Sequence, residues 1–506
     1  MSRIEQTIAA KKQKRAAMES AGILVHPYFF AKKHTIDQAT ALLGATDDNG
    51  EPQKAQTAGR VLAVRAHGKL KFFDLWDQTG KIQLLCNKAA LGDEAWKMLE
   101  LVDSGDFLGV EGAVQKSRTD EITIVAEKVS FLGKALRPLP TSFNAASDKE
   151  VRFRKRYLDM LINPQTQDVL SKRWRILRLL RTFMSEQLGY TEVETPILQP
   201  LYGGTNARPF TTTMKALDDE QFYLRIAPEL YLKRLIVGGM ERIFEIARNF
   251  RNEGIDQSHL PEFTMIEWYH AYADYNTMMA EIEQLIRFLH QEINGQETLM
   301  VGEVEVTLAG KEKWRRFTMK EALQRFADLD VDVMTDEYLQ KLLKKHGLQP
   351  IGEFTRGKAI FSLFDHLVTD KLIEPTWIID YPKDVSPLAK THRLNPDLTE
   401  RYELYIGGKE ISDGWSEITD PLEQRSRFEN EQKRMREGDD EAQPYDEDFL
   451  EAMEYGMSPL GGVGLGIDRL VMLLTNTWSI KEVIAFPTLK NIKNERNNAS
   501  DECDQE

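Results

Sequence analysis

The chain is poor in cysteine and has no long hydrophobic run, and each shortage excludes a class of protein. Only two cysteines occur in 506 residues, Cys86 in a strand-like run and Cys503 in a polar tail. We therefore expect neither a disulfide framework nor a cysteine-ligated zinc site. No run of about eighteen apolar residues is present and the N-terminus lacks an apolar stretch, which argues against a membrane span and a secretory signal. We expect a cytoplasmic protein with no membrane partner.

Several catalytic motifs are also missing. The sequence contains no HExxH, paired-cysteine, P-loop or GxSxG pattern, so zinc-dependent and nucleophilic chemistry have no visible apparatus. The segment GGVGLGID carries Gly462, Gly464 and Gly466, a spacing that does not match the dinucleotide-binding G-x-G-x-x-G. We interpret it as a bare backbone against which a ligand can lie, with Arg469 opening the next helix toward the same site.

Charge is abundant but unevenly distributed. Hydrophobic residues make up 42% and charged residues 29% of the chain, as in globular proteins, and the net charge of −14 argues against a simple nucleic-acid coat protein. Residues 1–35 are nevertheless basic overall. A basic N-terminal helix is compatible with contact to a phosphate backbone, although a solvated helix with no partner explains the same pattern equally well.

Patterns of short strands and longer helices divide the chain into segments. Five short strand-like runs separated by glycine-containing turns predict a small barrel, for which the OB-fold is the natural candidate. The longer region after it predicts a large α+β domain. The predicted segments are a basic helix and extension at 1–56, the barrel at 57–135, a linker at 136–150, the large domain at 151–487 with a helical insertion at about 290–373, and a polar, disordered tail at 488–506.

The predicted barrel carries residues suited to RNA. Phe72 and Phe73 are adjacent, so strand alternation buries one ring and exposes the other. An exposed ring near Arg65 would stack on a single-stranded base, and Gln83 and Glu121 on neighbouring strands would read base edges. This pattern favours a nucleic-acid role for the barrel.

A charged hairpin is predicted at 241–275. Strand alternation places one set of side chains on a shared face: Glu245, Asn249, Arg251, Glu253, Phe263, Met265, Glu267 and Tyr269. An arginine there would grip phosphate and a phenylalanine would stack on a base, so the face suits a nucleotide and a charged small molecule. A hairpin with an ordinary solvated polar face is the alternative.

The strand-like stretch 401–418 gathers four carboxylates: Glu403, Glu410, Asp413 and Glu417. Such a cluster is costly unless cations neutralise it. Glu403 and Glu410 would suit Mg²⁺ that is held largely through phosphates, and Glu417 would suit an ammonium group. An exposed acidic strand remains the alternative for this segment alone.

Three motifs in order carry a resemblance to a known family: GYTEVETP, then FRNEG followed by HLPEFTMIE, then GLGIDRLVML. The segments GGTNARPF, LRIAPELYLKRL, YIGGKEI and RYLDML fit the same family. Over roughly residues 3–487 the chain resembles the class II lysyl-tRNA synthetases of the bacterial type. The resemblance implies an N-terminal OB-fold anticodon-binding domain, a class II catalytic domain built on an antiparallel sheet flanked by helices, and a homodimer.

The resemblance also implies a two-step reaction. Lysine and ATP give lysyl-adenylate and pyrophosphate, and the lysyl group then passes to the 3′-end of lysine tRNA. No covalent nucleophile is needed, because the lysine carboxylate attacks ATP in line while the protein supplies positioning and charge.

Matching motif positions imply a role for each site residue. For ATP they are Arg251 at the α-phosphate, Phe263 stacked on adenine, Glu253 at the adenine edge, His259 at the distal phosphates and Arg469 at the γ-phosphate, with Glu403 and Glu410 binding Mg²⁺; Arg251 and Arg469 are the catalytic pair. For lysine they are Gly204 and Glu229 at the α-ammonium, Glu417, Tyr269 and Glu267 at the ε-ammonium, and Asp413 and Trp415 beside them. For the anticodon they are Arg65, Phe72, Gln83 and Glu121.

Two positions depart from the family, which usually has asparagine and phenylalanine where this chain has Asp413 and Trp415. Asp413 would stand near the substrate carboxylate, which an anion repels unless it is protonated or bridged to a cation. Altered amino-acid specificity within the same class is therefore an alternative function. Trp415 keeps an aromatic wall, so we expect its effect to be mild.

Three rival functions remain to be weighed. Specificity for aspartate or asparagine disagrees with Glu229 and Glu417, because aspartate needs a cationic pocket. The lysyl-transferring relative that modifies an elongation factor lacks an anticodon barrel. A non-catalytic RNA-binding or regulatory protein on the same fold would have no reason to keep Arg251, Phe263 and Arg469.

Overall fold

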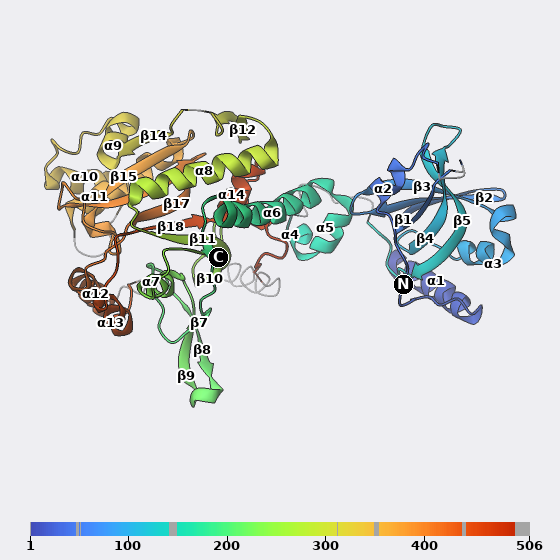
Figure 1. Ribbon diagram of the computed structural model, residues 1–506, viewed down its shortest axis with the longest axis horizontal. Helices are drawn as coiled ribbons and strands as arrows, with labels where there is room; N and C mark the ends of the chain where they lie inside the picture. Colours follow the sequence, from blue (N-terminus) through green and yellow to red (C-terminus); the bar gives the residue numbers. More distant parts are fainter. Residues whose placement is uncertain are drawn as a thin grey trace, which may run out of the picture. The chain divides into compact units, whose positions relative to one another are not determined.

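The computed structural model describes residues 2–46, 50, 52–140, 149–310, 312–348, 354–437 and 442–490. The chain divides into two compact units, Met1–Asn144 and Ala145–Glu506, which Figure 1 shows in blue and in teal to red. Residues 141–148 of the predicted linker and 491–506 of the predicted tail lie outside the described residues. Within the described ranges, no helix is both long and apolar enough to cross a bilayer.

The first unit is a closed five-stranded barrel, as the sequence predicts. Its strands are β1 (Lys54–His67), β2 (Leu70–Asp77), β3 (Gly80–Asn87), β4 (Phe107–Lys116) and β5 (Ile122–Gly133), arranged in the order β1-β2-β3-β5-β4. All neighbours are antiparallel except β3 and β5. Helices α1 (Arg3–Ser20), α2 (Ile36–Ala41) and α3 (Lys88–Glu100) complete the unit. Alternation buries Phe73 completely and leaves Phe72 half-buried on the outer face.

The second unit is built on an eight-stranded sheet in the order β14-β15-β16-β17-β18-β11-β10-β6. Its strands are β6 (Thr191–Glu192), β10 (Arg242–Phe250), β11 (Glu262–Ala271), β14 (Arg315–Thr318), β15 (Thr376–Pro382), β16 (Leu398–Ile406), β17 (Lys409–Ser416) and β18 (Leu460–Gly466). The six central strands are antiparallel, as predicted, whereas the edge pairs β14–β15 and β6–β10 are parallel. The sheet is therefore mixed at its edges.

Long helices cover one side of this sheet in Figure 1. These are α6 (Pro164–Thr182), which continues into a π-helical turn at Phe183–Gln187, α8 (Tyr275–Asn294) and α14 (Ile467–Leu474). Their apolar residues pack into one core with strand residues such as Trp268 and Trp377, which are both fully buried. The burial of so much apolar area holds the central strands rigid beneath the site.

Smaller elements surround the central sheet. Helices α7 (Glu229–Val237), α12 (Pro421–Arg436) and α13 (Glu447–Glu454) form one group, and strands β7 (Leu198–Gln199), β8 (Phe210–Met214) and β9 (Glu220–Leu224) form a separate small sheet. The predicted helical insertion contains helices α9 (Met319–Ala327), α10 (Asp336–Lys345) and α11 (Arg356–Leu367). It also contains β14 and the hairpin of β12 (Thr298–Val301) and β13 (Val304–Thr307), which apolar periodicity did not predict.

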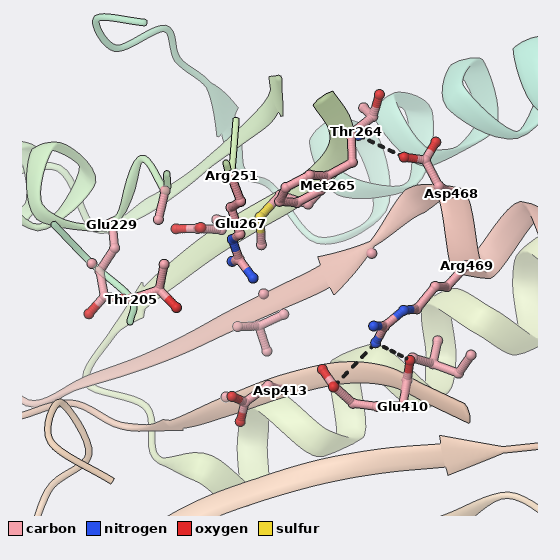
Figure 2. A pocket seen from close by; sticks show the side chains of 18 of the residues that line it. Thr205, Glu229, Arg251, Thr264, Met265, Glu267, Glu410, Asp413, Asp468 and Arg469 are labelled. Carbon is pink, nitrogen blue, oxygen red and sulfur yellow. Dashed lines mark hydrogen bonds and ion pairs between the residues drawn. The ribbon is translucent and has the colours of Figure 1, made fainter. Parts of the chain in front are cut away.

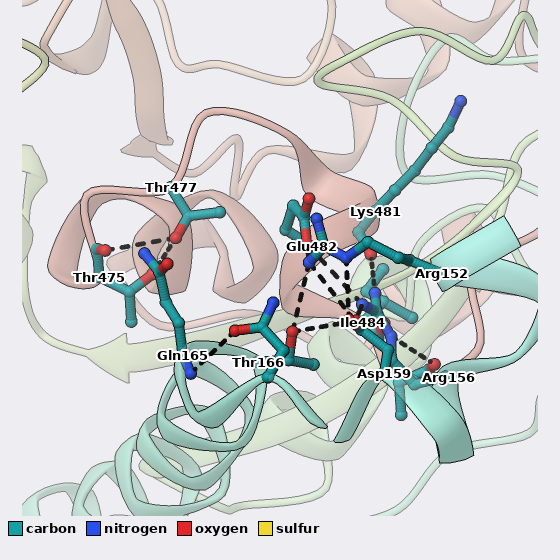
Figure 3. A network of polar contacts seen from close by, with 12 residues as sticks. Arg152, Arg156, Asp159, Gln165, Thr166, Thr475, Thr477, Lys481, Glu482 and Ile484 are labelled. Carbon is teal, nitrogen blue, oxygen red and sulfur yellow. Dashed lines mark hydrogen bonds and ion pairs between the residues drawn. The ribbon is translucent and has the colours of Figure 1, made fainter. Parts of the chain in front are cut away.

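A buried polar network ties the start of the second unit to its C-terminal helix (Figure 3). Short helices α4 (Lys149–Arg154) and α5 (Arg156–Ile162) face α15 (Ile480–Val483). The fully buried Arg156 donates to Asp159 and to three carbonyls at residues 481–485, and Arg152 pairs with both Asp159 and Glu482. The N–H of Ile480 bonds to the carbonyl of Gln257, so the network also anchors the loop after β10.

Candidate active site

A cavity of about 360 Å³ opens on the face of the sheet formed by β11, β17 and β18. Every candidate residue of the large domain lines it except Glu403: Gly204, Glu229, Arg251, Glu253, His259, Phe263, Glu267, Tyr269, Glu410, Asp413, Trp415, Glu417 and Arg469. Figure 2 shows the guanidinium of Arg251 pointing into this cavity, with Glu229 to one side of it and Arg469 to the other. Residues far apart in the sequence thus meet at one site of a size suited to a small ligand.

The glycine-rich strand β18 forms the floor of the cavity. Gly462 lies opposite Tyr269 on β11 and Trp415 on β17, and Gly464 lies opposite Glu267 and Asp413. A Cβ at Gly462 would come within 1.9 Å of a Glu417 carboxylate oxygen. The bare backbone therefore makes room for side chains that line the cavity, and its place in an antiparallel sheet excludes a dinucleotide-binding βαβ unit.

Hairpin β10–β11 supplies the ionic face that its sequence predicts. The register pairs Glu245 with Glu267 and Asn249 with Phe263, which puts these side chains on the same side of the sheet. Glu245, Glu267 and Tyr269 are almost fully buried, so this is not an ordinary solvated face.

Arg251 follows β10 and faces the ring of Phe263. Its guanidinium carbon lies 5.0 Å from the ring centroid, within cation–π range, and its buried Nε has no hydrogen-bond partner among the described residues. Burial lowers the pKa of Arg251, while the nearby Glu253 and Glu410 oppose that change. A guanidinium held this way beside an aromatic ring can bind an anionic group next to a stacked base.

Arg469 belongs to a short chain of polar contacts at the opposite end. It donates to the carbonyl and the carboxylate of Glu410 at 2.9 and 3.2 Å, and it lies 2.9 Å from Nε2 of His259. A guanidinium cannot accept a hydrogen bond, so Nε2 of His259 accepts one from Arg469 and the imidazole carries its proton on Nδ1. Nδ1 lies 2.8 Å from the Asp256 carboxylate. Burial alone would raise the pKa of Glu410, but Arg469 and Arg401 hold it below its usual value.

The helix α14 that carries Arg469 is fixed to β11 and α6 by Asp468. This carboxylate accepts the Thr264 N–H at 2.8 Å and pairs with Arg173 of α6 at 2.6 Å. Figure 2 shows the contact between Asp468 and Thr264 at the edge of the cavity. One buried carboxylate therefore joins the second and third sequence motifs through a hydrogen bond and ties both to α6 through an ion pair.

Buried acidic groups line the other end of the cavity. Glu417 is 1% exposed and accepts the Trp415 indole N–H at 2.7 Å. The sequence predicted Trp415 only as an aromatic wall and did not predict this hydrogen bond. Tyr269 donates to Glu267 at 3.2 Å, and burial raises the pKa of Glu267 well above its usual value. Sequence reasoning missed Lys233, which pairs with both Glu229 and Glu417 at 2.5 Å.

Asp413 is bridged to a cation that sequence reasoning also missed. Arg401 on β16 donates to both Asp413 oxygens, at 3.0 and 2.9 Å, and to Glu403 at 2.7 Å. Burial alone would lower the pKa of Arg401, but Asp413 and Glu403 raise it, so this guanidinium stays charged. Burial still raises the pKa of Asp413 to about 6. Alternation along β16 offered a signal for this contact, because Arg401 and Glu403 fall on one face.

The two carboxylates suggested for Mg²⁺ differ in their surroundings. Glu410 lines the cavity, whereas Glu403 lies behind it, bound to Arg401 and to the Tyr405 hydroxyl. Burial raises the pKa of Glu403 to about 8. No group of three potential metal ligands is present in the ranges that the structure describes. The donor set therefore fits a cation that takes most of its ligands from phosphate and water.

The barrel brings its four candidate residues onto its outer face. Phe72 pairs in register with Arg65 on β1, and Gln83 pairs with Thr123 on β5. Gln83 donates to Glu121 at 2.7 Å, and Arg65 pairs with Asp74 at 2.7 Å. A half-exposed ring therefore sits among polar groups on neighbouring strands, as base recognition requires.

Comparison with known proteins identifies one family over almost the whole chain. Residues 148–490 match the tRNA synthetases class II (D, K and N), and residues 55–132 match the OB-fold nucleic acid binding domain. The chain is 45% identical over 483 residues to a lysine–tRNA ligase of Methanoculleus marisnigri, with 95% of this chain and 94% of that protein covered. Lysine–tRNA ligases of Magnetococcus marinus and Halalkalibacterium halodurans are each 42% identical, with 96% of this chain and 97% of theirs covered.

Proposed function

Because the chain belongs to the class II tRNA synthetases of the aspartate, lysine and asparagine group, we propose that it is a lysine–tRNA ligase. One observation carries the amino-acid assignment: a single cavity joins a cationic, aromatic end to an end lined by buried carboxylates. The first end suits ATP, and the second suits a substrate with two ammonium groups. The side chain of an aspartate or asparagine substrate would bring no ammonium group to these carboxylates.

Adenylate formation needs positioning and charge rather than a protein nucleophile. One carboxylate oxygen of lysine attacks the α-phosphorus of ATP in line, and pyrophosphate leaves with the electron pair of the broken P–O bond. Arg251 stabilises the charge that develops on the α-phosphate, and Phe263 holds the adenine by stacking. Arg469 and His259 bind the distal phosphates, and Glu253 contacts the adenine edge.

Lysine is oriented by the acidic end of the cavity. Gly204 and Glu229 receive the α-ammonium, while Glu417, Tyr269 and Glu267 receive the ε-ammonium. Since these carboxylates are buried, a substrate without the ε-ammonium would leave a buried acceptor without its donor, at a cost of about 1–3 kcal/mol. Arginine is longer and forked, so the depth of the pocket excludes it.

Mg²⁺ accompanies ATP in this proposal. Glu410 would hold it from the cavity wall, with Glu403 as a second carboxylate behind it, and the cation would neutralise charge on the phosphates. Burial raises the pKa of Glu403, and a nearby divalent cation would lower that pKa again.

The barrel would bind the anticodon of lysine tRNA through Arg65, Phe72, Gln83 and Glu121. We also propose a homodimer, supported by the family resemblance of the first motif and by two exposed apolar residues, Trp174 on α6 and Ile197 directly after the motif. Because the reaction consumes ATP and tRNA, we assign the protein to the cytoplasm.

Amino-acid-dependent exchange of pyrophosphate into ATP tests the proposal directly. We expect exchange with lysine alone when each of the standard amino acids is supplied in turn. Exchange with another amino acid would establish altered specificity, the alternative that Asp413 raises. An absence of exchange with every amino acid would favour a non-catalytic role.

A further inference from the structure

A lysine side chain of the protein itself lies buried behind the acidic end of the cavity. Lys233 stands one helical turn after Glu229 on α7, and its side chain is 0% exposed. Its Nζ lies 2.5 Å from Glu229 Oε1 and 2.5 Å from Glu417 Oε2. Lys233 is not among the residues that line the cavity, so it acts on a ligand only through these two carboxylates.

Each of these carboxylates gives one oxygen to Lys233 and keeps the other. Among the described residues, neither Glu229 Oε2 nor Glu417 Oε1 has a hydrogen-bond partner, although both carboxylates line the cavity. Glu267 lines the same end of the cavity, so three buried carboxylates and one internal cation surround the place where the ammonium groups of lysine would bind.

We propose that Lys233 is a positioning and specificity residue for the amino-acid substrate. Its ammonium joins Glu229 to Glu417 and sets the separation of their remaining oxygens to the spacing of the α- and ε-ammonium groups of lysine. This inference rests on the proposed function and adds to it an internal cation that organises the lysine pocket.

The internal cation also favours the charged forms of its two carboxylate partners. Burial raises the pKa of Glu417 to about 8 and raises that of Glu229, while Lys233 opposes both shifts. Burial alone would lower the pKa of Lys233, but its two partners raise it above the usual value, so it remains charged. The other groups that face this set are Glu267 and Tyr269, with Glu245 and Arg225 behind them. Without Lys233, the buried carboxylates would take up protons and lose their attraction for ammonium groups.

Chain-length discrimination follows from the same geometry. Both carboxylates are held by one buried ammonium, so the distance between the oxygens that face substrate cannot adjust freely. Ornithine has one methylene fewer than lysine and cannot reach both at once. Loss of the bridge should therefore weaken lysine binding and reduce the preference for lysine over ornithine.

The test compares Lys233→Met, Lys233→Arg and a matched control, Lys134→Met, in pyrophosphate exchange by the full chain. Lys134 is an equally buried lysine that pairs with Asp103 at 2.7 Å and Asp106 at 2.9 Å in the barrel unit, away from the proposed anticodon residues. Lysine KM, ATP KM and the lysine-to-ornithine ratio of kcat/KM are measured between about pH 6.5 and 8.5, and thermal unfolding is followed for each variant.

We expect Lys233→Met to raise the lysine KM about 100-fold near neutral pH while the ATP KM changes less than about twofold. Its defect should grow as pH rises toward 8.5, because Glu417 then ionises in the unaltered protein and stays protonated in the variant. Lys134→Met should lose thermal stability and keep the lysine KM. Lys233→Arg retains the charge with a different head group, so it should raise the lysine KM about tenfold and admit more ornithine.

An unchanged lysine KM in Lys233→Met, or equal increases in the lysine and ATP KM values, would overturn the positioning role. If Lys233→Met does not fold, a Lys233→Arg variant with wild-type lysine KM and ornithine discrimination would overturn it equally. Absence of lysine-dependent exchange in the unaltered protein would refute the proposed function. Normal exchange in the unaltered protein with insensitive variants would refute only the role of Lys233.

Discussion

Replacing Asp413 by asparagine removes one negative charge from the cavity wall while preserving the size of the side chain. We expect Asp413→Asn to lower the lysine KM, because Asp413 lines the cavity and the family resemblance implies that the substrate carboxylate binds near it. At an effective dielectric constant of about 20, a unit charge about 7 Å away contributes about 2.4 kcal/mol. The two bonds from Arg401, at 3.0 and 2.9 Å, cancel much of that field. A residual repulsion of about 1 kcal/mol predicts a roughly fivefold lower KM.

The pH dependence of this effect provides its sharpest test. Burial raises the pKa of Asp413 to about 6, so the carboxylate repels the substrate above that pH and loses its charge below it. The ratio of wild-type to variant KM in pyrophosphate exchange should therefore be largest above about pH 7 and approach one below about pH 5.5. Asp380→Asn is the control, because it removes a half-buried aspartate from β15 outside the cavity. An unchanged or higher KM in Asp413→Asn would refute the reasoning.

Three further substitutions test separate parts of the molecule. Trp415→Phe removes the 2.7 Å hydrogen bond to Glu417, so we expect about a tenfold higher lysine KM at constant ATP KM. This effect is larger than the mild one that the sequence predicts. Equal lysine KM values in the variant and the unaltered protein would show that the bond contributes nothing. Phe72→Ala should raise the tRNA KM at least tenfold, since a stacked base contributes about 1–3 kcal/mol. Pyrophosphate exchange should stay intact. Equal loss of both activities would contradict the assignment of tRNA binding to the barrel and of catalysis to the large domain. Arg156→Met should lower the free energy of unfolding in urea by about 3–5 kcal/mol, because it leaves three buried carbonyls at residues 481–485 without their donor and takes one of two guanidinium partners from Asp159. A loss below about 1 kcal/mol would contradict this expectation.

Much of the scaffold could be predicted from local patterns. Alternation on β2 predicted that one of Phe72 and Phe73 is buried, and the structure buries Phe73 and leaves Phe72 half-buried, the ring that the family resemblance implies for stacking. The same period put Glu245 and Glu267 on one face, and the antiparallel register of β10 with β11 pairs them directly. The parallel edge pairs could not be predicted, because an edge strand chooses its neighbour through contacts distant in sequence.

The compensating charges of the site were harder to predict than the charges they compensate. Lys233 lies four residues after Glu229, so helical spacing could have suggested that contact. Its second partner, Glu417, directly follows strand β17 and is distant in the sequence. Arg401 reaches Asp413 across β16 and β17, whose register shifts between Leu404 and Tyr405. A sequence alone does not fix a register that contains such an irregularity.

These two cations change how the acidic cluster should be understood. Four carboxylates on one hairpin are unfavourable in isolation, and the sequence suggested that ligand cations must neutralise them. The structure instead provides Arg401 for Asp413 and Glu403, and Lys233 for Glu417 and Glu229, both from within the fold. The site can therefore assemble before any ligand arrives, because cations of the fold already pair with both oxygens of Asp413 and with one oxygen each of Glu403, Glu229 and Glu417. What remains unsatisfied faces the cavity, and a preorganised anionic wall of this kind spends the binding energy of lysine on orientation rather than on assembling the pocket.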